Sequence, residues 1–329
     1  MTPLILCVIL IALLFEFING FHDTANAIAT SVYTRVLTPA RAILMASSMN
    51  FLGALISERV AKTITSGLIG IEIEEYVILA ALIGAIIWNL ITWWRGIPSS
   101  SSHALIAGLV GASIVYAAGT HAILWGGVLL KVVVPLFVSP VLGFCVAFCV
   151  MRLINRICEN MASGKVKGVF GKLQIFSAAF MAFSHGTNDA QKTMGIITLT
   201  LISAGILPLD SGVPVLIKLV CAAAMAAGTS AGGWKIMKTL GGGVTKLQPP
   251  GGFAAEASAA SVIEMMSHFG APVSTTHTIT SAVMGVGSAK RLSAVKWGKA
   301  KDIVSAWVIT LPVCMALGGV VCWIISLIV

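Results

Sequence analysis

Two short stretches place a row of hydroxyl side chains and a histidine inside an otherwise apolar chain. GIPSSSSHALIAGLVGA begins at residue 96, and GAPVSTTHTITSAVMGVG repeats its pattern 174 positions later. A helix that starts at such hydroxyls exposes unpaired backbone N–H groups and the positive end of its dipole, which together bind anions. One serine would suffice for plain N-capping, whereas two matched tips favour a shared site for a tetrahedral oxyanion. The hydroxyls predicted to bind it are Ser100, Ser101, Ser102, Ser274, Thr275 and Thr276.

A second pair of motifs places carboxylates inside apolar stretches. FINGFHDTANA (17–27) resembles FSHGTNDAQKT (183–193), which aligns Asp23 with Asp189 at an offset of 166. A carboxylate in such surroundings is costly and by default marks a functional site. Oxygen-rich clusters on a segment expected to be unwound suit a hard cation, Na⁺, or a proton pathway. The residues predicted to couple a cation are Asp23, Asn26, Asn188 and Asp189, and Asp23 and Asp189 would ligate the metal if it is Na⁺.

Three further polar residues accompany these motifs. Lys192 stands where the first copy has Asn26, so its ammonium would either contact the anion or neutralise Asp189. Lys192 and the neighbouring Gln191 are therefore added to the predicted anion ligands. Glu16, also within an apolar stretch, is expected at the membrane interface. No HExxH motif or paired Cys/His spacing indicates a zinc site. We therefore predict no cofactor besides the coupling ion, Na⁺ or H⁺.

The composition places the chain in a membrane. Of its 329 residues 57% are hydrophobic and 10% are charged, and the mean hydropathy is +0.98. Soluble domains carry about a quarter charged residues, so this balance excludes a soluble enzyme and predicts an all-α polytopic membrane protein. The net charge of +9 does not indicate nucleic acid, because the basic residues fall between apolar segments, where the positive-inside rule expects them.

The charge distribution orders the crossings. Fifteen of the 21 Lys and Arg residues lie in the stretches 34–41, 152–172, 234–252 and 290–301. We place these in the cytoplasm and the acidic stretches 71–75 and 207–210 outside, which also puts both termini outside. The predicted spans are then 3–33, 42–57, 122–150, 173–206, 213–233 and 302–328.

Two apolar segments, 77–119 and 253–289, have both flanks on one side of the membrane under this assignment. We predict each of them to be a re-entrant helical hairpin with a Ser/Thr-His stretch at its tip. Their first arms, 77–94 and 253–269, approach the length of about 20 residues that crosses a bilayer. An alternative in which each arm spans fully breaks the charge rule.

A third matched landmark indicates an internal duplication. LWGG…SPVLG and KWGK…LPVCM pair Trp125 with Trp297 at an offset of 172, in the same order as the other motifs. We predict repeat 1 over 1–155, a cytoplasmic basic linker over 156–172 and repeat 2 over 173–329. Three spans per half make the repeats inverted in topology. Such repeats are typical of secondary transporters, which bind their substrate near the midplane and work by alternating access.

Together these motifs resemble the inorganic phosphate transporter (Pit) family. The duplicated blocks are GFHDTANA and HGTNDAQKT, and IWNLITWWRGIPSSSSHALIAGLVGA and PVSTTHTITSAVMG add to them. The likeness covers nearly the whole chain and is greatest to bacterial low-affinity members, although the long hydrophilic central loop of many members is missing. The resemblance implies symport of inorganic phosphate with a cation. In the bacterial branch this is often H⁺, with phosphate carried as a neutral metal complex, and other members use Na⁺.

The resemblance also implies a multi-pass protein of the cell (inner) membrane whose partners are phosphate, the cation and the lipid bilayer. A homodimer is left open. The main alternative is a sulfate permease of the same fold. Sulfate carries no proton at pH 7 and needs only donors, whereas HPO₄²⁻ benefits from a buried acceptor such as Asp23 or Asp189. An intramembrane enzyme has no obvious use for inverted repeats, and an anion channel would need a continuous pore.

Overall fold

The computed structural model describes residues 2–208 and 210–328, and nearly all of its regular structure is helical. Within these ranges five helices are long and apolar enough to cross a membrane, or up to seven when two bent pairs are counted as spans. The long helices are α1 (Pro3–Tyr33), α4 (Glu75–Arg95), α6 (Trp125–Val128) continuing into α7 (Val134–Ile157), α8 (Ser163–Ser203) and α13 (Trp297–Ser326). The other helices are α2 (Pro39–Ala54), α3 (Arg59–Ser66), α5 (Ser101–Tyr116), α9 (Val215–Ala231), α10 (Trp234–Lys238), α11 (Pro249–His268) and α12 (Thr275–Lys290). The predicted all-α polytopic class is confirmed.

The helices occur twice in the same order. The series α1, α2–α3, α4–α5 and α6–α7 is followed by α8, α9–α10, α11–α12 and α13. The bent pair α2–α3 turns by 62°, and its counterpart, α9 followed by Trp234–Gly243, turns by 60°. Short 3₁₀ turns at Thr120–Ala122 and Leu292–Ala294 precede the last helix of each series. This order agrees with the predicted duplication, while the repeat boundaries and the inverted orientation stay predictions.

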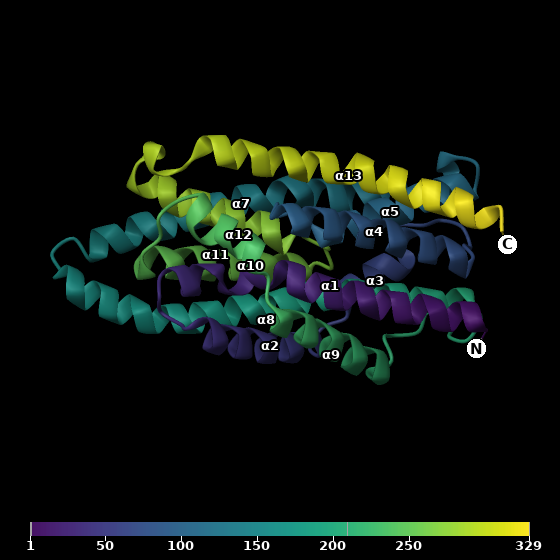
Figure 1. Cartoon of the computed structure of the whole chain (residues 1–329), viewed down its shortest axis with the longest axis horizontal. Helices are drawn as coiled ribbons and strands as arrows, with labels where there is room; N and C mark the ends of the chain where they lie inside the picture. The colour runs from purple at the N-terminus through teal and green to yellow at the C-terminus, as the bar shows by residue number, and fades with distance from the viewer. Residues whose placement is uncertain (1, 209, 329) are drawn as a thin grey trace.

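The chain termini and the turn between the two halves, from α7 to α8, lie at opposite ends of the molecule (Figure 1). This arrangement agrees with termini on one side of the membrane, and that this side is the outside stays a prediction. Helix α8 begins at Ser163, so the second half of the basic segment 156–172 is helical.

The breaks in the helices do not lie where the sequence indicated. Helices α1 and α8 run without interruption through Asp23 and Asp189, so the expectation of an unwound segment there was wrong. The interruptions lie instead between α2 and α3 and between α9 and α10. The polar side chains of α1 and α8 find partners on neighbouring helices, so their backbone keeps its own hydrogen bonds.

Glycines beside the two aspartates serve close packing. A Cβ atom on Gly20 would lie 2.4 Å from the carbonyl oxygen of Met225, and one on Gly186 would lie 2.3 Å from that of Asn50. Helix α1 can therefore approach α9, and α8 can approach α2, only with glycine at these positions. Small residues at such crossings are typical of helices packed in membranes.

Each hairpin turns at a glycine in the left-handed region. Helix α4 ends at Gly96 (φ 66°), and α11 is followed by Gly270 (φ 68°). Only glycine adopts this conformation freely. The helices α4 and α11 have therefore already ended before Pro98 and Pro272. The second arms, α5 and α12, pack back against α4 and α11.

Candidate functional site

The tips of the two hairpins meet. The Ser102 hydroxyl at the start of α5 donates to the carbonyl of Val273, just before α12, at 3.3 Å. The rings of His103 and His277 lie 5.1 Å apart between centroids, and His277 also stacks on Trp307 at 4.0 Å. The positive ends of two helix dipoles therefore converge on one buried region.

The six predicted hydroxyls differ in the contacts that they make. Ser100 and Ser274 each accept a hydrogen bond from a backbone N–H of their own helix, of His103 and His277 respectively, at 3.2 Å. These two serines are N-caps. The buried Ser101 hydroxyl has no hydrogen-bond partner in the part of the chain that the structure describes, so it is available to a ligand.

The hydroxyls of Thr275 and Thr276 contact the two aspartates. Asp23 and Asp189 are buried. The Thr275 hydroxyl donates to Asp189 Oδ2 at 3.0 Å, and the Thr276 hydroxyl donates to Asp23 Oδ1 at 3.5 Å. His185 Nε2 lies 3.0 Å from Asp189 Oδ2 and 4.0 Å from Asp23 Oδ2. One ligand atom from each of Asp23, His185 and Asp189 falls within 4.8 Å of the others, which is close enough to hold a cation.

Corresponding residues of the two halves make corresponding contacts. The Lys192 ammonium forms an ion pair with Asp189 and donates to the Ser102 hydroxyl. Asn26, its counterpart on α1, donates to the Thr276 hydroxyl at 2.8 Å. Each residue thus crosses from its own helix to the hairpin tip of the other half. Of the two roles expected for Lys192, neutralising Asp189 is the one seen here.

Two predicted ligands are hydrogen-bonded to surrounding helices, although the buried Asn188 Oδ1 has no partner among the described residues. The Gln191 side chain accepts the backbone N–H of Val60 at 2.8 Å, at the start of α3. Asn188 donates to the Ser267 hydroxyl at 2.6 Å, near the end of α11. Both residues support the surrounding helices and neither contacts the aspartates through these bonds.

Histidines that the sequence did not assign hold the aspartates in place. His22 Nδ1 lies 2.6 Å from Asp23 Oδ1, and its Nε2 lies 3.1 Å from the Thr92 hydroxyl. His185 Nδ1 lies 3.1 Å from Asn50 Oδ1. Asn50 is a lone amide in an apolar stretch, which is a signal that could have identified it.

Two more carboxylates are fully buried. Glu16 accepts a hydrogen bond from the Thr193 hydroxyl inside the protein, and its expected position at the membrane interface stays a prediction. Glu256 on α11 was not singled out from the sequence.

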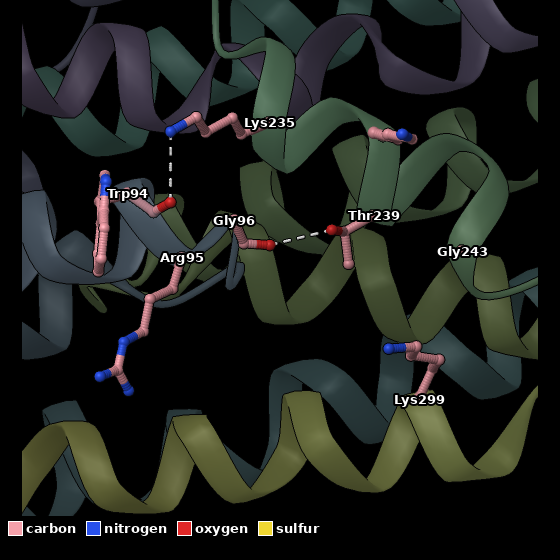
Figure 2. A pocket seen from close by; sticks show the side chains of 8 residues that line it. Trp94, Arg95, Gly96, Lys235, Thr239, Gly243 and Lys299 are labelled. Carbon is pink, nitrogen blue, oxygen red and sulfur yellow. Dashed lines mark hydrogen bonds between the residues drawn. The ribbon is translucent and has the colours of Figure 1, made fainter.

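A basic pocket lies beside the turn of the first hairpin (Figure 2). Its charged lining residues are Arg95, Lys235, Lys238 and Lys299. The Lys235 ammonium donates to the carbonyl of Trp94 at 3.4 Å, and the Thr239 hydroxyl donates to the carbonyl of Gly96 at 2.9 Å. Helix α10 and the turn after it thereby hold the end of α4.

A counterpart pocket lies beside the turn of the second hairpin. Its basic lining residues are Arg59, Lys62, Lys131 and His268. The Arg59 guanidinium donates to the carbonyl of His268 at 2.7 Å, and the Thr63 hydroxyl donates to that of Gly270 at 2.7 Å. These acceptors lie 174 positions after Trp94 and Gly96, so both hairpins are held in the same way.

Comparison with known proteins places these features in one family. A model described as "Phosphate transporter family" matches residues 19–318. A protein of Bacillus subtilis (strain 168) named "Probable low-affinity inorganic phosphate transporter" is 45% identical over 99% of this chain and 98% of its own length. A protein of the same name in Rhizobium meliloti (strain 1021) is 48% identical over 94% of this chain and 93% of its own.

A solved structure, "The sodium-dependent phosphate transporter", superimposes with a TM-score of 0.90 at 27% identity and covers all of both chains. The chain belongs to the phosphate transporter family.

Proposed function

We propose that this protein is a membrane transporter, not an enzyme, that carries inorganic phosphate together with a cation. The observation that carries the proposal is the meeting of two hydroxyl-bearing helix N-termini beside two buried carboxylates. The anion would be held by backbone N–H groups of α5 and α12 and by the hydroxyls of Ser101, Ser102 and Thr276. The names of the relatives support phosphate as this anion.

The charge of the site supplies a reason for cation coupling. Within the described ranges, Lys192 is the single buried lysine, and its ammonium pairs with Asp189 and not with Asp23. Two unit charges of like sign about 5 Å apart repel by about 3 kcal/mol at an effective dielectric constant of about 20. A dianionic phosphate therefore binds beside the two carboxylates far better when a cation accompanies it. Each of the two ligands then raises the affinity of the site for the other.

Na⁺ is the coupling ion that the arrangement of oxygens favours. Carboxylates and hydroxyls suit hard cations, and Thr275 and Thr276 bring hydroxyls to the aspartates. The name of the structural neighbour points to Na⁺ as well. Asp23 and Asp189 would be the principal ligands, and a magnesium titration would distinguish free phosphate from a metal–phosphate complex as the transported species.

The matched hydrogen bonds that hold the turns of the two hairpins are consistent with alternating access around this site. The matched contacts at the ends of α4 and α11 would open in turn, as expected of inverted repeats in a cell membrane. The basic pockets beside these contacts would collect phosphate on each face, because clefts of one charge raise the local concentration of the opposite ion.

Counterflow of radiolabelled phosphate in proteoliposomes tests the proposal. The purified protein should exchange internal for external phosphate, and an inward Na⁺ gradient should drive accumulation. Unlabelled sulfate should compete poorly. If sulfate competes as well as phosphate, the protein is a sulfate permease, and if neither anion exchanges, the transport proposal is wrong.

A further inference from the structure

Glu16 is a buried carboxylate whose hydrogen bonding is incomplete. It lies on α1, two turns before Asp23, and is fully buried. Its Oε2 accepts from the Thr193 hydroxyl. Its Oε1 has no hydrogen-bond partner among the described residues. An ionised carboxylate that is taken out of water needs several donors to compensate for its lost hydration, and Glu16 has only the Thr193 hydroxyl and the nearby Asn19 amide.

Glu256 shows what a well-compensated carboxylate looks like in the same protein. It is equally buried and accepts from Thr30, Gln174 and Ser177, the last two at 3.1 and 2.5 Å. Both of its oxygens are occupied. The contrast indicates that Glu256 is held as a fixed structural acceptor, whereas the surroundings of Glu16 suit a carboxyl group that carries a proton.

An acceptor for that proton lies on the same face of α1. Glu16, Asn19 and Asp23 follow at spacings of three and four residues, which places them in one row on the helix. Asn19 Oδ1 is buried and, like Glu16 Oε1, lacks a partner in the described ranges. Glu16, Asn19 and the central aspartate thus form one row of buried polar groups along α1.

The positions that correspond to Glu16 and Thr193 in the opposite halves carry no carboxylate or hydroxyl. At the offset of 166 that pairs the aspartates, Glu16 corresponds to Ala182, and Thr193 corresponds to Ala27. Both alanines are fully buried. The Glu16–Thr193 pair therefore has no counterpart at the duplicated positions, and Glu16 lies on the N-terminal side of Asp23 along α1.

We propose that Glu16 is a proton-binding site, separate from the Asp23–Asp189 cation site, and that it loads a proton from the face of the termini when phosphate is taken up. The inference rests on the proposed phosphate transport. The proton is bound at Glu16 Oε1 on loading and released when the site opens to the other face. No covalent step is involved.

The titratable and charged groups that act on Glu16 come from two packed helices. Helix α8 contributes Asp189 and Lys192, and α9 contributes the Cys221 thiol. Asp189 and Lys192 are already paired with each other, so their net field at Glu16 is small. Protonation of Glu16 would thus depend mainly on the pH on the side of the membrane from which the proton enters.

The test compares two modes of transport in proteoliposomes at constant Na⁺. With the outside acidic, the wild-type protein should accumulate phosphate above the level that it reaches at equal pH. Glu16→Gln keeps the size and hydrogen-bonding capacity of the side chain but cannot exchange a proton. It should retain phosphate exchange at equal pH and lose the accumulation driven by the pH difference.

A matched control and a second variant keep the test decisive. Glu256→Gln removes an equally buried carboxylate and should keep the wild-type ratio of pH-driven accumulation to exchange. Thr193→Val removes the hydroxyl that donates to Glu16, so the neutral form persists to higher pH and the pH midpoint of uptake should move to more alkaline values. This second variant decides the matter if Glu16→Gln does not fold.

The outcomes separate this inference from the proposed function. Wild-type protein that exchanges phosphate but gains nothing from the pH difference overturns the role of Glu16 and leaves phosphate transport intact. The role of Glu16 is equally overturned if folded Glu16→Gln keeps pH-driven accumulation, if it loses exchange as well, or if Thr193→Val leaves the midpoint unmoved. Folded wild-type protein that exchanges no phosphate contradicts the proposed function itself.

Discussion

Substitution of Ser101 by alanine should weaken phosphate binding without destabilising the protein. In the part of the chain described, the Ser101 hydroxyl is buried and makes no hydrogen bond, so its removal breaks no hydrogen bond of the ligand-free fold. If it donates to bound phosphate, the lost hydrogen bond to a charged oxygen is worth about 1.5 kcal/mol. Since 1.4 kcal/mol is a factor of ten, the dissociation constant should rise about tenfold.

The neighbouring Ser100→Ala is the matched control. Ser100 caps α5 through the backbone N–H of His103, and loss of such a cap lowers the free energy of unfolding by about 1 kcal/mol. Isothermal titration with phosphate and thermal unfolding of each purified variant give the two quantities. The reasoning is refuted if Ser101→Ala binds phosphate with wild-type affinity, or if its unfolding temperature falls as far as that of Ser100→Ala.

Three further predictions follow from the same geometry. Lys192→Met leaves the buried Asp189 without its ion pair and should lower the free energy of unfolding by about 3–5 kcal/mol. The double variant Asp189→Asn/Lys192→Met should recover much of this loss in denaturant titrations. Additive losses in the two variants would contradict the pairing. Lys62→Gln and Lys238→Gln each remove one charge from a basic pocket. Each should raise the apparent KM for phosphate on one face of the membrane only, measured in vesicles of fixed orientation. Equal effects on both faces would contradict the assignment of one pocket to each face. Single cysteines at Ser163 and Glu74 should react with impermeant reagents from opposite sides of the membrane, and labelling from the same side would be inconsistent with the predicted topology.

The sequence predicted the parts of the site that the duplication repeats. Asp23 and Asp189 were recognised because a carboxylate in an apolar stretch is conspicuous, and the hairpin tips because hydroxyls follow a glycine and a proline twice. The structure brings these four segments together, with Thr276 and Asn26 in contact. Matching offsets were informative because the two copies of each motif occupy corresponding places in the fold.

Features that depend on a partner distant in the sequence were not predictable. Gln191 was assigned to the anion because it follows Asp189 closely, but it accepts an N–H from α3. The breaks after α2 and α9 carry no proline at the bend. A single carboxylate in a hydrophobic run, such as Glu16, does not reveal which side chains surround it. Its position became clear only from Thr193, which lies on another helix.

The central claim is that one phosphate binds between the tips of α5 and α12. Arsenate is a tetrahedral analogue of phosphate that scatters X-rays anomalously, so crystals of the protein grown with arsenate report its position directly. The account predicts an anomalous peak within hydrogen-bonding distance of the Ser101 and Thr276 hydroxyls. A peak confined to the basic pockets beside Gly96 or Gly270, with none at the tips, would contradict it.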